Sequence, residues 1–262
     1  MNKINTILRK EWAEVFKNRM VLFTVAFMPL LFTALPLIIL YSMRGTSLAD
    51  ASNEIPQQIT GFCPNNLSGG ECMQVYLVSN FMLMFMMMPL VIPVTIAAYS
   101  IVGEKTTRSL EPLLATPITT FELLAGKSLA AAIPGIVATL IGFVIFAIGA
   151  AIMVSNPLLL AALLDARWLI AVGVAGPLMA FASTLLCLMV SARVNDPRVA
   201  EQISMVVIVP LLGLFFGQLS GFIVLNRQVI LILSAGLAAA DAALAYFAVR
   251  IFQREVILTR WK

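Results

Sequence analysis

The chain has 262 residues, of which 61% are hydrophobic and only 11% are charged. Soluble globular domains are usually about 45–50% apolar, so this composition excludes an ordinary soluble domain and indicates a polytopic membrane protein. The net charge of +4 does not indicate nucleic-acid binding, because the basic residues cluster beside apolar segments, and the absence of His removes the commonest proton shuttle and metal ligand.

The first 19 residues are predicted to lie at the inner membrane surface. A helix over residues 3–19 has one apolar face, made by Ile4, Ile7, Leu8, Trp12, Val15 and Phe16. The opposite face carries Lys3, Lys10, Glu14 and Lys17, and Trp12 with these cations suits the headgroup layer. A plain cytoplasmic extension of the first span is the alternative. The apolar stretch that follows is too long for the apolar core of a signal peptide, so we expect no cleavable leader.

Six apolar segments are long enough to cross about 30 Å of hydrocarbon at about 1.5 Å per residue. They lie near residues 20–42, 76–102, 128–154, 168–191, 202–224 and 229–249. The predicted fold is therefore an all-α polytopic membrane protein with six transmembrane helices in a single domain over residues 1–262. Because the number of spans is even, both termini lie on the same side of the membrane.

The basic residues predict which side that is. With the termini in the cytoplasm, 14 of the 17 basic residues face the cytoplasm and only Arg44, Arg167 and Arg227 face outward. We therefore expect a multi-pass protein of the cytoplasmic membrane with both ends inside.

Residues 43–75 form the largest predicted outer loop. Cys63 and Cys72 lie within it, and both face the oxidising side, so we predict a disulfide between them. Closing a loop of this size contributes about 2–3 kcal/mol to local order. The third cysteine, Cys187, is alone in an apolar run, and the three have no metal-binding spacing.

The second span carries the run Phe81 to Met88, which contains five methionines. Thioethers bind soft metals such as copper, but consecutive residues point around the whole helix and do not make one ligand set. A lipid-facing surface, or a flexible apolar surface for varied cargo, is the simpler interpretation.

A polar element at residues 103–127 interrupts this apolar chain. Leu110, Leu113 and Leu114 share one face of a predicted short helix, and Thr116–Pro117 then favours a turn. Thr119 and Glu122 match a capping box that begins the third span. Within the same element, Gly126-Lys127-Ser128 lacks the preceding glycine of a phosphate-binding loop, so we expect no nucleotide site in this chain.

The last two spans hold two further candidates. Gly213, Gly217 and Gly221 recur every four residues, which predicts a small-residue face for close helix packing, either within the subunit or across a dimer. Asp241 stands alone near the middle of the sixth span, where a charged carboxylate is costly unless it is neutral, paired or hydrated. It is a candidate pathway residue, or else a neutral residue that bonds to its neighbours.

The charged element and its surroundings resemble the type-2 permeases of ATP-binding-cassette exporters. The resemblance rests on G-E-K at the end of the second span, L-E-x-L-L-x-T-P-I after it and G-K opening the third. Arg9-Lys10-Glu11-Trp12 and the inner loop from Ser191 to Gln202 also resemble the family. Thr106, Arg108 and Ser109 depart from its usual pattern, which leaves the subfamily open.

The resemblance implies that residues 103–127 are a coupling helix that docks on a separate ATPase subunit. The implied docking residues are Glu104, Lys105, Arg108, Leu110, Glu111, Leu113 and Leu114. It further implies two ATPase copies and a second permease copy, with ATP and Mg bound by the ATPase and no cofactor or enzymatic activity in this chain. The substrate stays open among sodium, drugs, peptides and lipids.

Three other functions stay open. An ion-coupled secondary transporter would use Asp241, but no second buried charge completes a relay. A membrane-embedded lipid transferase would need clustered acidic metal ligands, whereas the acidic residues here are scattered. A purely structural subunit of a larger membrane complex is the third.

Overall fold

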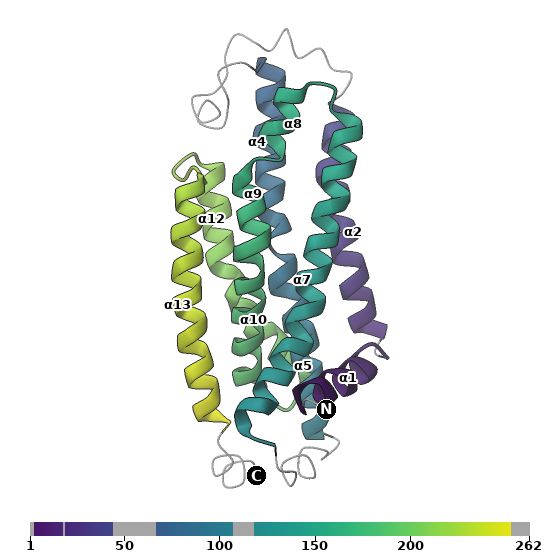
Figure 1. Cartoon of the computed structure of the whole chain (residues 1–262), viewed down its shortest axis with the longest axis vertical. Helices are drawn as coiled ribbons and strands as arrows, with labels where there is room; N and C mark the ends of the chain where they lie inside the picture. The colour runs from purple at the N-terminus through teal and green to yellow at the C-terminus, as the bar shows by residue number, and fades with distance from the viewer. Residues whose placement is uncertain (1–2, 18, 44–66, 107–117, 253–262) are drawn as a thin grey trace.

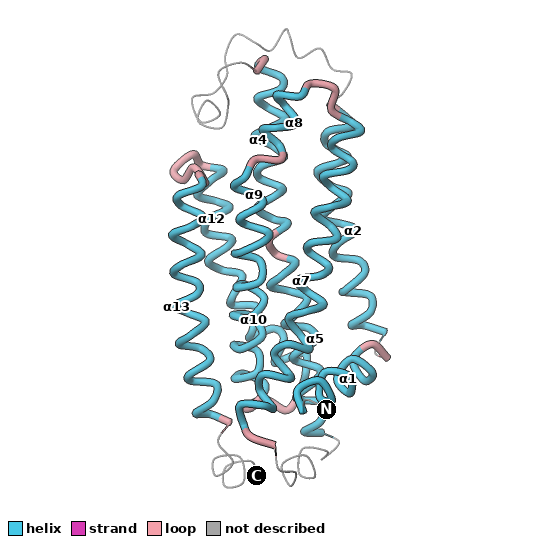
Figure 2. Tube along the Cα trace, in the orientation of Figure 1, coloured by secondary structure: helices cyan, strands magenta, loops and turns pink. Residues whose placement is uncertain are grey.

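The computed structural model describes residues 3–17, 19–43, 67–106 and 118–252, and every regular element within these ranges is helical (Figure 1). Six helical stretches of this described part are long and apolar enough to cross a membrane. Loops are confined mostly to the two ends of an elongated bundle (Figure 2). The prediction of an all-α polytopic fold is confirmed.

The first half of the chain supplies the N-terminal helix and three spans. Helix α1 covers Lys3–Val15, α2 covers Arg19–Ser42, α4 covers Gly69–Phe85, α5 covers Met88–Thr106 and α7 covers Thr120–Met153. Together, α4 and α5 make one crossing, from Gly69 to Glu104.

The second half supplies three further spans, and the first two of them consist of several shorter helical elements. It contains α8 (Pro157–Leu163), α9 (Ala166–Ile170), a π-helical turn (Ala171–Ala175), α10 (Gly176–Ser191), α11 (Pro197–Ser204), a 3-10 turn (Met205–Ile208), α12 (Val209–Leu219) and α13 (Arg227–Ile251).

The second and fifth spans begin earlier than the apolar runs predict, because polar caps start their helices. Ser68 caps α4 and forms a reciprocal capping box with Glu71, so the second span begins at Gly69 rather than near 76. Residues 69–75, including Cys72, are therefore helical and not part of the predicted outer loop. Asp196 caps α11 with Pro197 in its first turn, so the fifth span begins before residue 202.

The second span is broken in its middle at Met86–Met87. Pro89 lacks a backbone N–H and cannot continue the hydrogen-bond ladder of α4, so α5 starts anew at Met88. Within the methionine run, Met82, Met86 and Met88 are buried in the core. The prediction that this run faces lipid is wrong for these three residues, which fill the irregular space around the break.

The core lies along the second span. In the hydrophobic window of Gly69–Glu104, 83% of the residues are buried, against 28% or less for the windows in α2, α7, α11–α12 and α13. Helix α5 packs mainly against α10 and α7, and α13 packs on α10 (Figure 1). Helices α4 and α5 therefore form the centre of the bundle, with α2, α7 and α10 packed around them.

The glycine face predicted in the fifth span is only partly helical. Helix α12 ends at Leu219, and Gly221 lies beyond it with a φ of 76°, a conformation that suits glycine in the turn. A Cβ on Gly217 would lie 2.7 Å from Ile223 Cδ1 of the same chain, whereas nothing lies within 4 Å of such a Cβ at Gly213. The prediction of three glycines on one helix face is therefore wrong for Gly221, and whether Gly213 packs across a dimer stays open.

Candidate functional site

A buried ionic cluster lies where α1, α5 and α7 meet. The ammonium nitrogen of Lys127 lies 2.7 Å from Glu11 Oε1 and 2.7 Å from Glu104 Oε2. All three side chains are 2–3% exposed. Separating the helices would leave a buried charge without its partner, which is costly, so these ion pairs hold α1, α5 and α7 together.

Polar neighbours complete the cluster. Ser100 Oγ donates a hydrogen bond to Glu11 Oε2, and Lys127 Nζ donates to Ser100 Oγ over 3.0 Å. Lys10 donates to Glu104 Oε1 from the rim of the cluster. Two carboxylates thus face two ammonium groups, and the cluster is balanced in charge.

The rim cation Lys10 is held in its charged form. Burial alone would lower its pKa, but the hydrogen bond and the charge of Glu104 outweigh burial, so the pKa of Lys10 is raised above its ordinary value. A raised pKa for a base means that the ion pair is present at neutral pH and is lost only as the pH rises through that value. Lys10 therefore stays paired throughout the physiological range.

Helix α1 is fastened along the first turns of α7 by three further contacts. Trp12 Nε1 donates a hydrogen bond to the Ala130 carbonyl over 2.9 Å, and Lys3 pairs with Glu122 at 3.4 Å. A Cβ on Gly126 would lie 2.9 Å from Ile7 Cγ2, so glycine permits the close approach of the two helices. Helix α1 runs at an angle to α2 at one edge of the bundle's end (Figure 1), so it does not simply extend the first span.

The start of α7 follows the predicted capping box. Thr119 accepts a hydrogen bond from the Glu122 backbone N–H, and Glu122 accepts one from the Thr119 N–H. The helix therefore begins at Thr120 and runs through Lys127 without a break. The earlier start adds two turns to the predicted span and carries Lys127 into the cluster.

Among the predicted docking residues, the structure places Glu104 in this cluster. Arg108, Leu110, Glu111, Leu113 and Leu114 lie outside the described residues, as does the side chain of Lys105. Sequence reasoning missed Glu11, although its position carried a signal. Glu11 follows Ile7 and precedes Val15 at four-residue steps, so it lies on the apolar face of α1 and needs a buried partner.

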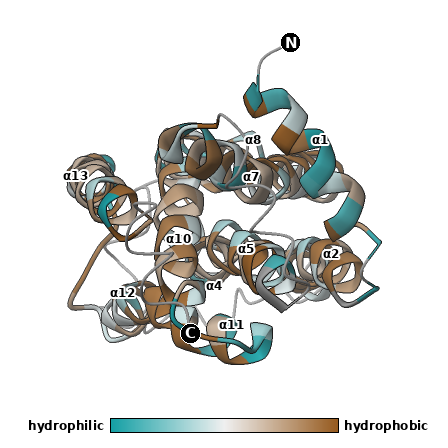
Figure 3. Ribbon diagram, turned by 90° about the horizontal axis from the view of Figure 1, so that it is seen from below, coloured by the Kyte–Doolittle hydropathy of each residue, from teal (hydrophilic) through white to brown (hydrophobic). Residues whose placement is uncertain are grey.

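A second polar link joins α11 to α5. Thr95 Oγ1 donates a hydrogen bond to Glu201 Oε1 over 2.6 Å, two residues after Pro93 within α5. Helix α11 also packs on both α5 and α10. Helix α11, at the start of the fifth span, thus contacts the same central helix as the ionic cluster. Figure 3, which views the bundle from this end, shows hydrophilic residues on α1 and α11.

The other predicted residues lie away from this cluster. Both carboxylate oxygens of Asp241 are buried on α13, with no hydrogen-bond partner among the described residues. Cys72 is disulfide-bonded, while Cys187 is free and buried. Cys63 lies outside the described residues, so its pairing with Cys72 stays a prediction.

A polar contact near the opposite end of the bundle was also missed. Gln218 and Asn80 are buried at 1% and 4% exposure, and Gln218 Nε2 donates to Asn80 Oδ1 over 3.4 Å. The contact joins α12 to α4. Amide side chains inside apolar segments are a sequence signal for such helix-to-helix bonds.

Comparison with known proteins gives one family. The model described as ABC-2 family transporter protein matches residues 5–247, which cover all six spans except the last turn of α13. The matched region also includes the whole ionic cluster and the polar segment between α5 and α7. No curated protein matches the chain at a significant level.

Proposed function

Because the chain belongs to the ABC-2 transporter family, as a membrane-embedded transport component, we propose that it is the permease of an exporter driven by ATP. In this proposal a separate ATPase subunit hydrolyses ATP, and the permease carries a substrate out across the cytoplasmic membrane. Two permease copies and two ATPase copies make the transporter. ATP and Mg²⁺ bind to the ATPase, and this chain binds no cofactor.

The observation that carries the proposal is the bridge from Lys127 to Glu104. Residues 107–117 connect α5 to α7, and the bridge joins these two helices directly beside that connection. A force applied to the connection therefore moves α5 and α7 together instead of opening a hinge between them. This is the mechanical property that a coupling element needs, since its partner must move the spans and not merely the loop.

The elements that would face the ATPase lie at the same end of the bundle as the Lys127–Glu104 bridge. At this end lie α1, the end of α5, the start of α7, α11 and the end of α13 (Figures 1 and 3). The basic residues on these elements favour a cytoplasmic location for this end. In the proposal, Arg108, Leu110, Glu111, Leu113 and Leu114 seat on the ATPase, while Glu104 anchors the seated segment to the bundle.

Movement would then spread through α5. Glu201 joins α11 to Thr95, two residues after Pro93 of α5, so α5 and the start of the fifth span would shift together. Since α5 packs against α7 and α10, closure of the ATPase pair would tilt the centre of each permease. The pathway in this proposal lies between the two permease copies.

Purification of the chain from its native membrane tests the proposal. We expect an ATPase subunit with a phosphate-binding loop to copurify, and its ATP hydrolysis to change when the permease is removed. Transport that persists after ATP depletion, with loss of activity in Asp241→Asn, would instead support an ion-coupled transporter. Purification of an active permease without any ATPase would overturn the proposal.

A further inference from the structure

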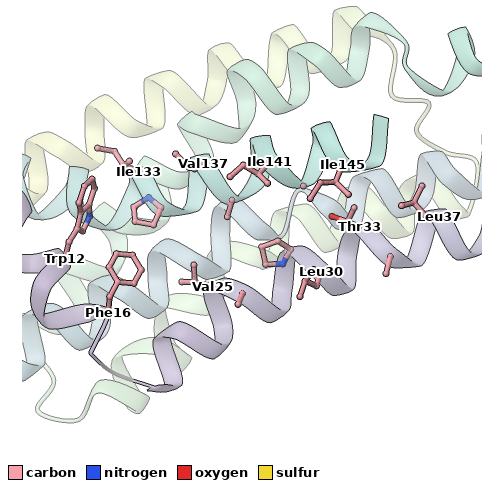
Figure 4. Close-up of a pocket in the computed structure, with 16 residues that line it drawn as sticks. Trp12, Phe16, Val25, Leu30, Thr33, Leu37, Ile133, Val137, Ile141 and Ile145 are labelled. Atoms are coloured by element: carbon pink, nitrogen blue, oxygen red, sulfur yellow. The ribbon is translucent and has the colours of Figure 1, made fainter. Parts of the chain in front are cut away.

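An apolar groove runs along the outside of the bundle between α2 and α7, with α1 closing one end (Figure 4). Its volume is about 760 Å³, which is within the range of about 300–1,000 Å³ for small-molecule sites. Thr33 is the only lining residue with a polar side chain apart from the indole of Trp12, whose N–H already bonds to Ala130. The groove therefore suits an apolar ligand.

The groove exists because small side chains face one another across it. Ala26, Pro29 and Ala34 line it from α2, while Pro134, Ala138 and Gly142 line it from α7. Larger residues form its rims, and Leu30 and Ile141 remain 65% and 53% exposed there. Small side chains thus leave space between the two helices, and the larger side chains of α2 and α7 can contact a ligand from two sides.

The two helices come together at the end away from α1. A Cβ on Gly149 would lie 2.6 Å from Leu37 Cδ2, and one on Gly142 would lie 3.0 Å from Thr33 Oγ1. Toward α1 the helices separate, and Trp12 and Phe16 close the groove at that end (Figure 4). The groove is therefore closed at both ends and is not a channel through the membrane.

Its length matches one leaflet of a bilayer. The lining runs from Val25 to Leu37 of α2, a rise of about 18 Å at about 1.5 Å per residue. Half of a hydrocarbon core of about 30 Å is about 15 Å. Both α2 and α7 are long and apolar enough to span a membrane. Hydrocarbon chains of the leaflet at the α1 end would then lie beside this groove.

Positive charge lies at the end where a headgroup would sit. Lys17 and Arg19 directly follow the groove residue Phe16, and both are exposed. Their ammonium and guanidinium groups suit the phosphate of a lipid, and basic residues beside a membrane attract anionic lipids in particular. An apolar groove of this length with two cations at one end suits one ligand class, an anionic lipid.

We propose that this groove binds one anionic phospholipid of the leaflet at the α1 end, with an acyl chain between α2 and α7 and its phosphate near Lys17 and Arg19. The lipid fills the space between the first and third spans and so packs against the helix that carries Lys127. The proposal does not depend on ATP-driven transport, because it concerns the resting subunit in any bilayer.

Photolabelling with phosphatidylglycerol that carries a diazirine in the middle of its acyl chain tests the proposal. The probe is added to phosphatidylcholine vesicles that contain the full-length protein. We expect labelled peptides from residues 25–37 and 133–145, and little label on the exposed face of α13. Label spread evenly over α2, α12 and α13 would overturn the proposal without any variant.

Two variants sharpen the test. Ala34→Phe with Ala138→Phe fills the groove, and we expect most of the labelling there to be lost, because the two rings occupy the space of the acyl chain. Ala238→Phe, at an exposed position of α13, is the matched control and should leave the labelling unchanged. Equal labelling in the filled variant would overturn lipid binding in the groove. A change of oligomeric state in the filled variant would show instead that a second copy covers this face.

The headgroup is tested separately. In Lys17→Gln with Arg19→Gln, the preference for phosphatidylglycerol over phosphatidylcholine should fall about tenfold, since each surface cation contributes to anionic-lipid binding. An unchanged preference would overturn the assignment of an anionic headgroup.

Discussion

Lys127 Nζ lies 2.7 Å from Glu104 Oε2, and this contact joins the end of α5 to the start of α7 across the segment of residues 107–117. The contact is buried, and Glu11 brings α1 to the same ammonium group. Because the contact joins α5 and α7 directly, the following predictions concern both the stability of the ionic cluster and its proposed use in coupling.

Loss of Lys127 should destabilise the protein strongly. Lys127→Met leaves Glu11 and Glu104 buried without their shared countercharge, and breaking a buried ion pair in this way costs roughly 3–5 kcal/mol. Thermal unfolding in detergent should show a large fall in midpoint. Lys3→Met, which breaks the exposed pair with Glu122, is the control and should cost no more than about 1 kcal/mol.

Neutralising Glu11 should partly restore the Lys127→Met variant. In Lys127→Met, Glu104 keeps its pair with Lys10, whereas Glu11 loses its ammonium partner. Glu11→Gln removes that carboxylate's charge, so the double variant should be more stable than the sum of the single effects by about 0.5–3 kcal/mol. A double-mutant cycle on unfolding free energies measures this coupling. Simple additivity would mean that the two side chains act independently and that the cluster is not a unit.

A methyl group at Gly126 should loosen α1. Gly126→Ala places a Cβ against Ile7, and overpacking of this kind costs roughly 1–3 kcal/mol. Gly213→Ala makes the same change in a helix where nothing lies within 4 Å, so it should be neutral or stabilise the protein by up to about 1 kcal/mol. Ile7→Ala should rescue the first variant. Equal effects of the two glycine substitutions would contradict the close packing of α1 on α7.

The sequence predicted some parts of this arrangement and missed others for identifiable reasons. Thr119 and Glu122 form a local signal, three residues apart, and the start of α7 follows from it. Ser68 and Glu71 carry the same signal, but their position before the apolar run placed them within the predicted loop. Local rules thus suffice for helix starts once the polar residues beside each apolar run are included.

The ionic cluster could not be predicted in the same way. Glu11, Glu104 and Lys127 are far apart in the chain, and only tertiary packing brings them together. Glu11 on an apolar face signals that a partner exists but not which one. Likewise, hydropathy marks Met82 and Met88 as apolar and does not tell the core from the lipid, because both are apolar surroundings.

The proposed coupling segment should be sensitive to charge and size. Glu111→Lys or Leu113→Trp should uncouple ATP hydrolysis from transport while the protein still inserts, because each alters the surface that is proposed to seat on the ATPase. Membrane abundance and substrate-stimulated ATPase activity are the two measurements. Phe222→Ala, 89% exposed at the far end of the bundle, is the control and should change neither. Normal stimulation in both coupling variants would count against the proposed seat.

The most direct test places a photoreactive amino acid at position 113 of the full-length chain in its native membrane and identifies what it captures. We expect a crosslink to an ATPase subunit that carries a phosphate-binding loop, with a yield that changes when ATP is added. Capture of lipid alone, or of no ATPase under any nucleotide condition, would contradict the account.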